Sequence, residues 1–110
     1  MTAGRGRVAH HVAAFDEAVA SGDWASFATR FAEDAVLDFV GVPAGPFVGR
    51  AAIAAAYDAQ PPTDTMDLLG VETDGDVDVA RFVWRAGGTG TMRFTWRDGT
   101  IARLVVAFDA

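Results

Sequence analysis

Three side chains of the sequence could carry out chemistry in a pocket: Asp38, Tyr57 and His11. Asp38 is the only carboxylate in a run of Val, Leu and Phe, where burial would raise its pKa and suit it to be a general base or a substrate anchor. Tyr57 offers a phenol that can donate to a ligand carbonyl in a dry pocket. His11 carries an imidazole, whose ordinary pKa near neutrality suits a proton shuttle. These residues are our candidates for cofactor-free acid–base chemistry.

Each candidate also has a purely structural interpretation. Asp38 can point to the opposite side of its strand from Phe39, where water or an arginine would hold it. Tyr57 can be a buried helix residue whose hydroxyl bonds a backbone acceptor. His11 can lie at the rim of the pocket or be as exposed as its neighbour His10. The sequence leaves these alternatives open.

Other kinds of site find no support in the sequence. There is no cysteine, which excludes disulfides, thiolate metal sites and cysteine nucleophiles. Asp74, Asp76 and Asp78 resemble the start of a calcium loop, but the glycine and glutamate that such a loop requires further on are missing, so we interpret them as a turn. His10 and His11 cannot face the same way on a helix, which argues against a zinc site. We therefore predict no metal and no cofactor.

The composition bounds the class of protein. A chain of 110 residues, of which 51% are hydrophobic, is long enough for one domain with one core, and we assign 1–110 to a single pocket domain. The net charge of −6 would repel nucleic acid and anionic lipid. The apolar runs are too short to span a bilayer. We predict a cytoplasmic protein that binds neither nucleic acid nor membrane.

The first half of the chain has helical patterns around one strand. Val8, Val12 and Phe15 recur at helical spacing, Gly22 is a stop signal, and Asp23 is a suitable N-cap for a second helix. The apolar stripe of that second helix is predicted to be Trp24, Phe27, Ala28 and Phe31. The elements expected from these patterns are a helix over 4–21, a second helix from 24, a strand over 35–42, a Pro/Gly loop over 42–46 and a third helix over 49–57.

The second half is β by pattern. Asp74-Gly75 and Asp98-Gly99 are hairpin turn signals, and the Gly-rich run 87–90 is predicted to turn the chain as well. The strands expected between these turns cover 66–73, 77–85, 91–96 and 101–108.

Side-chain alternation assigns the last three strands two different faces. The apolar set should pack on the helices and consists of Ala80, Phe82, Trp84, Met92, Phe94, Trp96, Leu104, Val106 and Phe108. The opposite set suits a wet surface or a partner interface, since it mixes Arg with Val and Thr. Its members are Arg81, Val83, Arg85, Arg93, Thr95, Arg97, Arg103 and Val105.

These elements predict an α+β fold: a cone-shaped roll of three N-terminal helices packed on a strongly curved, mainly antiparallel sheet. The pocket enclosed by the roll should be mostly apolar. We expect it to be lined by Phe15, Leu37, Phe39, Tyr57, Phe82, Trp84, Met92, Phe94, Trp96 and Leu104.

Several short motifs resemble the nuclear transport factor 2-like superfamily, which includes ketosteroid isomerases and SnoaL-like polyketide cyclases. The motifs are Ser21-Gly22-Asp23-Trp24, Phe31-Ala32-Glu33-Asp34-Ala35, Gly49-Arg50-Ala51-Ala52-Ile53 with Tyr57, and Asp98-Gly99-Thr100-Ile101-Ala102. The resemblance covers nearly the whole chain and implies the cone fold. It also implies a homodimer that forms through the outer face of the sheet.

The resemblance argues against one reaction of that superfamily. Ketosteroid isomerases use a base aspartate and an oxyanion hole of a tyrosine with a protonated acid. Aligned on the motifs, these positions fall on Phe39, Phe15 and Met92, while a supporting tyrosine falls on Tyr57. Because three apolar residues replace the three catalytic groups, we reject ketosteroid isomerisation by that mechanism.

Two functions remain. The first is a small-molecule-binding protein for an apolar or polycyclic ligand, as a binder or as a cofactor-free isomerase or cyclase-like lyase using Asp38 or His11 with Tyr57. The second is a non-catalytic binding or dimerisation module whose pocket is filled by its own side chains. A cavity of about 300 Å³ or more with a buried ionisable group would favour the first.

Overall fold

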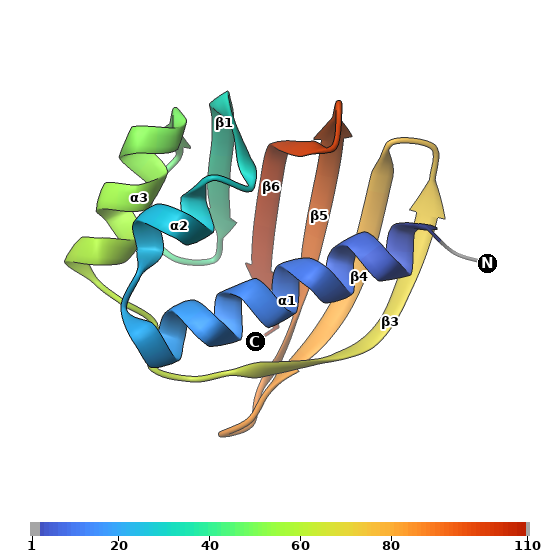
Figure 1. The fold of residues 1–110 in the computed structure, drawn as a ribbon. Helices are drawn as coiled ribbons and strands as arrows, with labels where there is room; N and C mark the ends of the chain where they lie inside the picture. The colour runs from blue at the N-terminus through green and yellow to red at the C-terminus, as the bar shows by residue number, and fades with distance from the viewer. Residues whose placement is uncertain (1–2, 110) are drawn as a thin grey trace.

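The computed structural model describes residues 3–109 as helices packed on one face of a curved sheet (Figure 1). The three helices cover the concave face and leave the other face open. In chain order the elements are α1 (Ala3–Ser21), α2 (Trp24–Ala28), β1 (Phe31–Val40), β2 (Phe47–Val48), α3 (Arg50–Ala59), β3 (Met66–Asp74), β4 (Val77–Trp84), β5 (Thr89–Arg97) and β6 (Thr100–Phe108).

The strands of this part of the chain form one six-stranded sheet in the order β2-β1-β6-β5-β4-β3. The ladder between β1 and β6 is parallel, with Leu37 opposite Leu104, and the other ladders are antiparallel. The sheet is therefore mixed, and it does not close on itself. This architecture confirms the predicted α+β cone.

The helix boundaries follow the predicted signals. Gly22 ends α1 with a φ of +77°, a conformation that favours glycine, and its N–H donates to the Ala18 carbonyl at 2.7 Å. Asp23 caps α2, because its Oδ1 accepts from the Ser26 N–H at 3.1 Å. The joint between the first two helices is thus as the sequence predicted. Among residues 3–109, no helix is both long and apolar enough to cross a membrane.

The first strand differs from its prediction. It begins at Phe31 instead of residue 35, so Phe31 belongs to the sheet and not to the stripe of α2. Phe31 lies opposite Ile101 of β6, and its carbonyl accepts from Arg50 Nε at 2.9 Å. The short strand β2 was not predicted at all. The early start of β1 depends on pairing with the distant strand β6, which local patterns do not contain, whereas β2 has only two residues, too few to form a pattern.

The glycine-rich run after β4 was also only partly a turn. Its last two residues, Thr89 and Gly90, belong to β5, and Gly90 lies opposite Phe82. A Cβ at position 90 would stand 2.5 Å from Phe82 Cζ and 2.6 Å from the Ala107 carbonyl oxygen. Gly90 is therefore required because the ring of Phe82 lies across its backbone.

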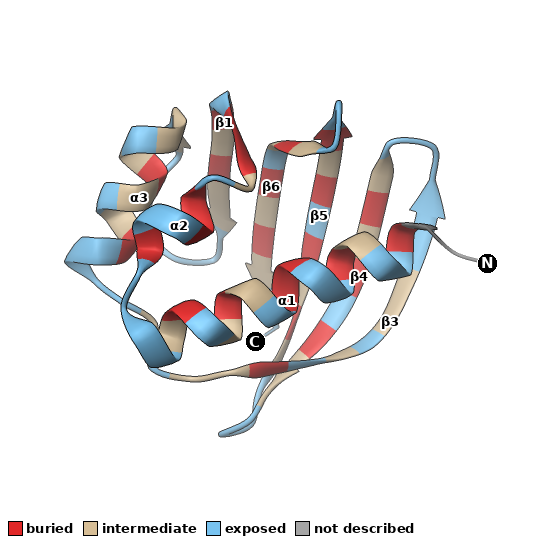
Figure 2. Ribbon diagram, viewed as in Figure 1, coloured by how far each residue is buried: buried red, intermediate tan, exposed pale blue. Residues whose placement is uncertain are grey.

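The alternation predicted for the strands is confirmed. Figure 2 shows buried positions alternating with intermediate or exposed ones along the strands. Phe82, Met92 and Leu104 are buried on the concave face, whereas Arg81 and Arg93 are exposed on the outer one. Because this alternation places the apolar side chains on one side of the strands, the concave face has an almost wholly apolar surface.

Candidate functional site

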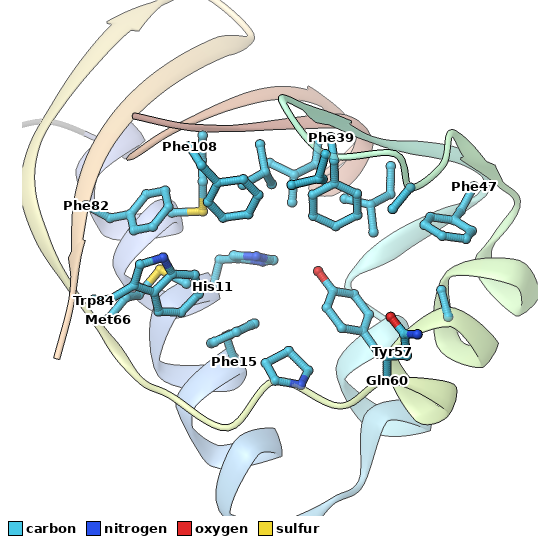
Figure 3. Close-up of a pocket in the computed structure, with 18 of the residues that line it drawn as sticks. His11, Phe15, Phe39, Phe47, Tyr57, Gln60, Met66, Phe82, Trp84 and Phe108 are labelled. Atoms are coloured by element: carbon cyan, nitrogen blue, oxygen red, sulfur yellow. The ribbon is translucent and has the colours of Figure 1, made fainter. Parts of the chain in front are cut away.

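A cavity of about 620 Å³ lies between the concave face of the sheet and the helices (Figure 3). Its walls come from α1, β1, the loop after β1, β2, α3, the segment after α3, and β3 to β6. The residues that line it are His11, Phe15, Leu37, Phe39, Val42, Pro43, Ala44, Phe47, Ala56, Tyr57, Gln60, Pro62, Met66, Phe82, Trp84, Met92, Leu104, Val106 and Phe108.

Two titratable side chains, His11 and Tyr57, stand among the described residues that line this cavity. Figure 3 shows them pointing into the space from opposite sides, His11 from α1 and Tyr57 from α3. Most of the remaining walls are aromatic rings, methionines and aliphatic side chains. The structure thus brings two of the three predicted catalytic candidates together.

His11 is held by aromatic rings and not by hydrogen bonds. It lies one helical turn before Phe15 on α1, is only 2% exposed, and its ring contacts Phe94, Phe27 and Phe31 at centroid distances of 5.0, 5.1 and 6.0 Å. Nδ1 is buried and has no hydrogen-bond partner among residues 3–109. Burial, and then the positive charge of Arg30, lower the pKa of His11 to about 3. The imidazole is therefore neutral at pH 7.

Tyr57 is placed by the stripe of α3 and by a ring of α2. Ile53 lies one turn before it, and both side chains are buried. The phenol stacks on Trp24 with centroids 4.7 Å apart and planes at 10°. Its hydroxyl points toward the middle of the cavity (Figure 3). Burial raises the pKa of Tyr57, so the hydroxyl stays protonated and can donate a hydrogen bond.

Phe27 packs against both polar side chains of the cavity, His11 and Tyr57. Its ring centroid lies 5.1 Å from that of His11 and 5.3 Å from that of Tyr57. Phe27 is buried but does not line the cavity. The five-residue helix α2 therefore contacts both polar side chains of the cavity, a role that the sequence pattern did not reveal.

Asp38, the third predicted candidate, does not line the cavity. It lies opposite Val105 in the ladder between β1 and β6, on the outer face of the sheet. Its carboxylate is 3.8 Å from the guanidinium of Arg103 and accepts from the N–H of Phe39 at 2.9 Å. This placement corresponds to the structural alternative given for Asp38, while Phe39 points inward.

Eight of the ten predicted lining residues border the cavity, and Phe94 and Trp96 do not. Phe94 is fully buried behind His11. Trp96 lies further along β5, and its Nε1 donates to Asp78 Oδ2 at 2.8 Å. Both rings are on the concave face, as alternation predicted, but at the other end of the cone.

Asp78 is not the turn residue that its spacing indicated. It lies in β4, is fully buried, and accepts hydrogen bonds from Arg7 Nε, from Thr73 Oγ1 at 2.6 Å and from Trp96 Nε1. Burial by itself would raise the pKa of this carboxyl, but the three hydrogen bonds hold it below its usual value. The cluster fixes the start of α1, and hence the helix that carries His11, to the sheet.

The mouth of the cavity consists of residues that the sequence reasoning did not select. Val42, Pro43, Ala44, Gln60 and Phe108 line the cavity and are exposed. They come from the loop after β1, the end of α3 and the last strand, three segments far apart in the chain. Turn residues in the sequence indicate such loops. No local sequence pattern indicates that these three segments lie next to one another in the fold.

The sequence of this chain matches the family model of the SnoaL-like domain over residues 12–104. The chain belongs to the SnoaL-like family. No curated protein matches it in sequence.

Solved structures similar to this SnoaL-like chain share its fold. An NTF2-like protein of unknown function from Burkholderia xenovorans has a TM-score of 0.72 at 15% identity, over 98% of this chain and 87% of that one. A Bacillus subtilis protein provisionally described as an isomerase has a TM-score of 0.77 at 18% identity, over 98% and 90%. A Sinorhizobium meliloti protein provisionally described as a polyketide cyclase has a TM-score of 0.64 at 27% identity, over 88% and 93%.

Within this SnoaL-like domain the three positions aligned with the isomerase catalytic groups face one space. Phe15, Phe39 and Met92 all line the cavity. None of these side chains can accept a proton or donate a hydrogen bond to an oxyanion. What the cavity offers instead is a protonated phenol, a neutral imidazole and a large apolar surface.

Proposed function

We propose that this SnoaL-like domain binds a small, flat, apolar or polycyclic molecule in its cavity without a cofactor. The observation that carries the proposal is the cavity of about 620 Å³ with aromatic, methionine and aliphatic walls. Ligand pockets in proteins measure about 300–1,000 Å³ and combine apolar walls with a few polar groups that orient the ligand. Here His11 and Tyr57 are those groups.

The cavity weighs against a module filled by its own side chains. Such a module would leave a space too small for a ligand, or one without a polar atom. This cavity exceeds the lower limit of about 300 Å³ and holds two buried ionisable groups. Both criteria therefore favour binding.

The charge states of the polar groups favour binding over proton abstraction. An efficient general base has a pKa near the working pH. His11, with a pKa of about 3, is a weak proton acceptor at pH 7, and Tyr57 keeps its proton because burial raises its pKa. Asp38 lies outside the cavity lining. The charge states of His11 and Tyr57 therefore suit hydrogen bonding to a ligand better than proton abstraction.

An isomerase or cyclase-like lyase activity is the second candidate. It is favoured by the likeness to the Sinorhizobium meliloti protein described as a polyketide cyclase, at 27% identity. In this version Tyr57 polarises a ligand carbonyl and His11 accepts a proton from the adjacent carbon. Turnover should then be lost in Tyr57→Phe and in His11→Gln but kept in Asp38→Asn. Turnover that survives the first two substitutions would refute it.

We also propose that two copies pair through the outer face of the sheet. The helices leave this face open (Figure 1), and it mixes exposed Arg93 with half-buried Thr95 and Val105. Arg is enriched at protein interfaces, and a symmetric dimer buries the same patch on both copies. Sedimentation should give a dimer at micromolar concentration that Val105→Asp converts to monomer. A wild-type monomer would contradict this.

Native mass spectrometry against a panel of planar polycyclic hydrocarbons, ketones and phenols tests the binding function. The wild-type protein should retain at least one compound at a ratio of one to one. Ala56→Trp should abolish retention because Ala56 lines the cavity, whereas Ala55→Trp, on the exposed side of the same helix, should not. Retention of none by the wild type, or equal retention by Ala56→Trp, would overturn the proposal.

A further inference from the structure

Two polar side chains face each other inside a cavity whose other walls are mainly apolar. Figure 3 shows the hydroxyl of Tyr57 and the ring of His11 entering the space from opposite sides. Gln60 also lines the cavity, but it is exposed at the mouth. A ligand that fills the interior of the cavity therefore finds its polar side-chain partners in His11 and Tyr57.

The contacts of Phe27 with both side chains limit the distance between the rings of His11 and Tyr57. The centroid of Phe27 is 5.1 Å from that of His11 and 5.3 Å from that of Tyr57. The two rings cannot be farther apart than these distances added together. That upper limit is close to the reach of a single ligand oxygen that makes a hydrogen bond of about 2.8 Å to each polar atom.

The rings are oriented before a ligand arrives. His11 is enclosed by Phe27, Phe31 and Phe94, and Tyr57 stacks on Trp24. Nδ1 of His11 is buried without a partner in residues 3–109, so Nε2 is the nitrogen that remains for a ligand. Oriented groups lose little side-chain entropy on binding, which favours recognition of a matching oxygen.

The pair carries no charge at pH 7, and no arginine lines the cavity among the described residues. Arg30, whose charge acts on His11, lines a separate hollow with Arg7 and Trp96. A carboxylate placed between His11 and Tyr57 would lose its hydration without gaining a cation as a partner. That loss outweighs what hydrogen bonds return, whereas a carbonyl or hydroxyl loses far less.

We infer that His11 and Tyr57 together bind one uncharged oxygen of the ligand, a ketone carbonyl or a hydroxyl, and that the cavity rejects carboxylates of the same shape. This inference rests on the proposed function and specifies its ligand class. A ketone would accept from Tyr57 and from His11. A hydroxyl would accept from Tyr57 and donate to His11, so both fit the neutral imidazole.

Four compounds of nearly one shape test the inference by calorimetric titration at pH 7: naphthalene, 2-naphthol, 2-acetylnaphthalene and 2-naphthoate. The ketone, the hydroxyl compound or both should bind about tenfold more tightly than naphthalene, the ratio expected from two net hydrogen bonds. Naphthoate should bind at least about tenfold more weakly than naphthalene because it carries a charge.

Three variants test whether His11 and Tyr57 cause the preference for ligands that carry an uncharged oxygen. Tyr57→Phe keeps the ring on Trp24 but removes the hydroxyl, and it should reduce the preference for oxygen to less than about threefold while naphthalene still binds. His11→Gln should change the ratio of ketone to hydroxyl binding, since the imidazole is lost. His10→Gln, an exposed neighbour, is the matched control and should keep the wild-type ratios. Circular dichroism would show that each variant is folded.

The outcomes of these titrations distinguish a failure of the inference from a failure of the proposed binding function. If naphthalene binds and Ala56→Trp abolishes that binding, but the oxygen compounds bind no more tightly, the inference fails and the binding function stands. A preference that survives Tyr57→Phe, or naphthoate that binds as well as the ketone, would also overturn the inference. If none of the four compounds binds, the inference fails, and the wider panel of planar compounds decides the binding function.

Discussion

Tyr57 stacks on the indole of Trp24, with the two rings 4.7 Å apart and only 10° from parallel. Through this contact a five-residue helix orients the only tyrosine of the chain toward the cavity. Trp24 is 2% exposed, and its Nε1 is buried without a hydrogen-bond partner among residues 3–109. The indole therefore contributes packing, while its N–H costs free energy.

Trp24→Ala should lower the free energy of unfolding by about 3–5 kcal/mol, because it leaves a large cavity under Tyr57. Trp24→Phe should cost less than half as much, since a ring remains and the unpaired N–H is removed. Urea titration followed by far-ultraviolet circular dichroism measures both values. Equal losses for the two variants would contradict the role given to the ring.

The neutral state of buried His11 predicts how stability depends on pH. The unfolded chain takes up a proton on this imidazole below about 6.5, but the folded chain does so only near pH 3. Stability from this residue is therefore fully present above pH 6.5 and falls as the pH is lowered. The loss approaches about 1.4 kcal/mol per pH unit, or about 2 kcal/mol between pH 7 and pH 5.

Comparison of variants isolates this contribution. The difference in unfolding free energy between wild type and His11→Gln should shrink by about 2 kcal/mol from pH 7 to pH 5. His10→Gln removes an exposed imidazole from the same helix and should retain the wild-type dependence. A difference that stays constant with pH would mean that His11 is not held neutral.

Two glycines of α1 should respond in opposite ways to alanine. A Cβ at Gly4 would collide with Thr73 Oγ1 and Asp78 Oδ1, whereas a Cβ at Gly6 meets nothing within 4 Å. Gly6→Ala should stabilise the protein by up to about 1 kcal/mol through helix propensity. Gly4→Ala should destabilise it despite the same propensity. Thermal unfolding compares the two, and stabilisation by Gly4→Ala would contradict the close contact between α1 and the sheet.

The ionised carboxylate of Asp78 should be necessary for full stability of the fold at neutral pH. Asp78→Asn should lower the free energy of unfolding by about 3 kcal/mol because Arg7 loses its buried partner. The pKa of Asp78 lies below its ordinary value, so its contribution is present above about pH 4 and is lost as the pH falls below that. The two proteins should therefore converge in stability in acid. Asp76→Asn, at an exposed position, should change stability by less than about 0.5 kcal/mol.

Local sequence patterns predicted the two faces of the last three strands, because alternation is a property of the strand itself. Phe82, Met92 and Leu104 face inward, and Arg81 and Arg93 face outward, as the period of two requires. The same patterns could not predict how far along the cone a residue lies. That position depends on the register between strands and on the curvature of the whole sheet.

Phe94 and Trp96 illustrate this limit. Alternation assigns them to the concave face, but His11 covers Phe94, and Trp96 reaches Asp78 instead of the cavity. The burial of Asp78 depends on Arg7, which lies 71 residues earlier in the chain. In the sequence alone, three aspartates at alternate positions next to a glycine indicate a turn. The buried carboxylate therefore needed the tertiary structure to be found.

Methyl resonances of the cavity methionines provide the most direct test of ligand binding. Met66 and Met92 both line the cavity, from β3 and β5. In protein labelled with ¹³C at the methionine methyls, titration with naphthalene should shift both resonances in a saturable way, and the aromatic ring should show nuclear Overhauser contacts to both methyls. Resonances of Met66 and Met92 that stay unchanged at saturating naphthalene would contradict the claim that this cavity binds flat apolar molecules.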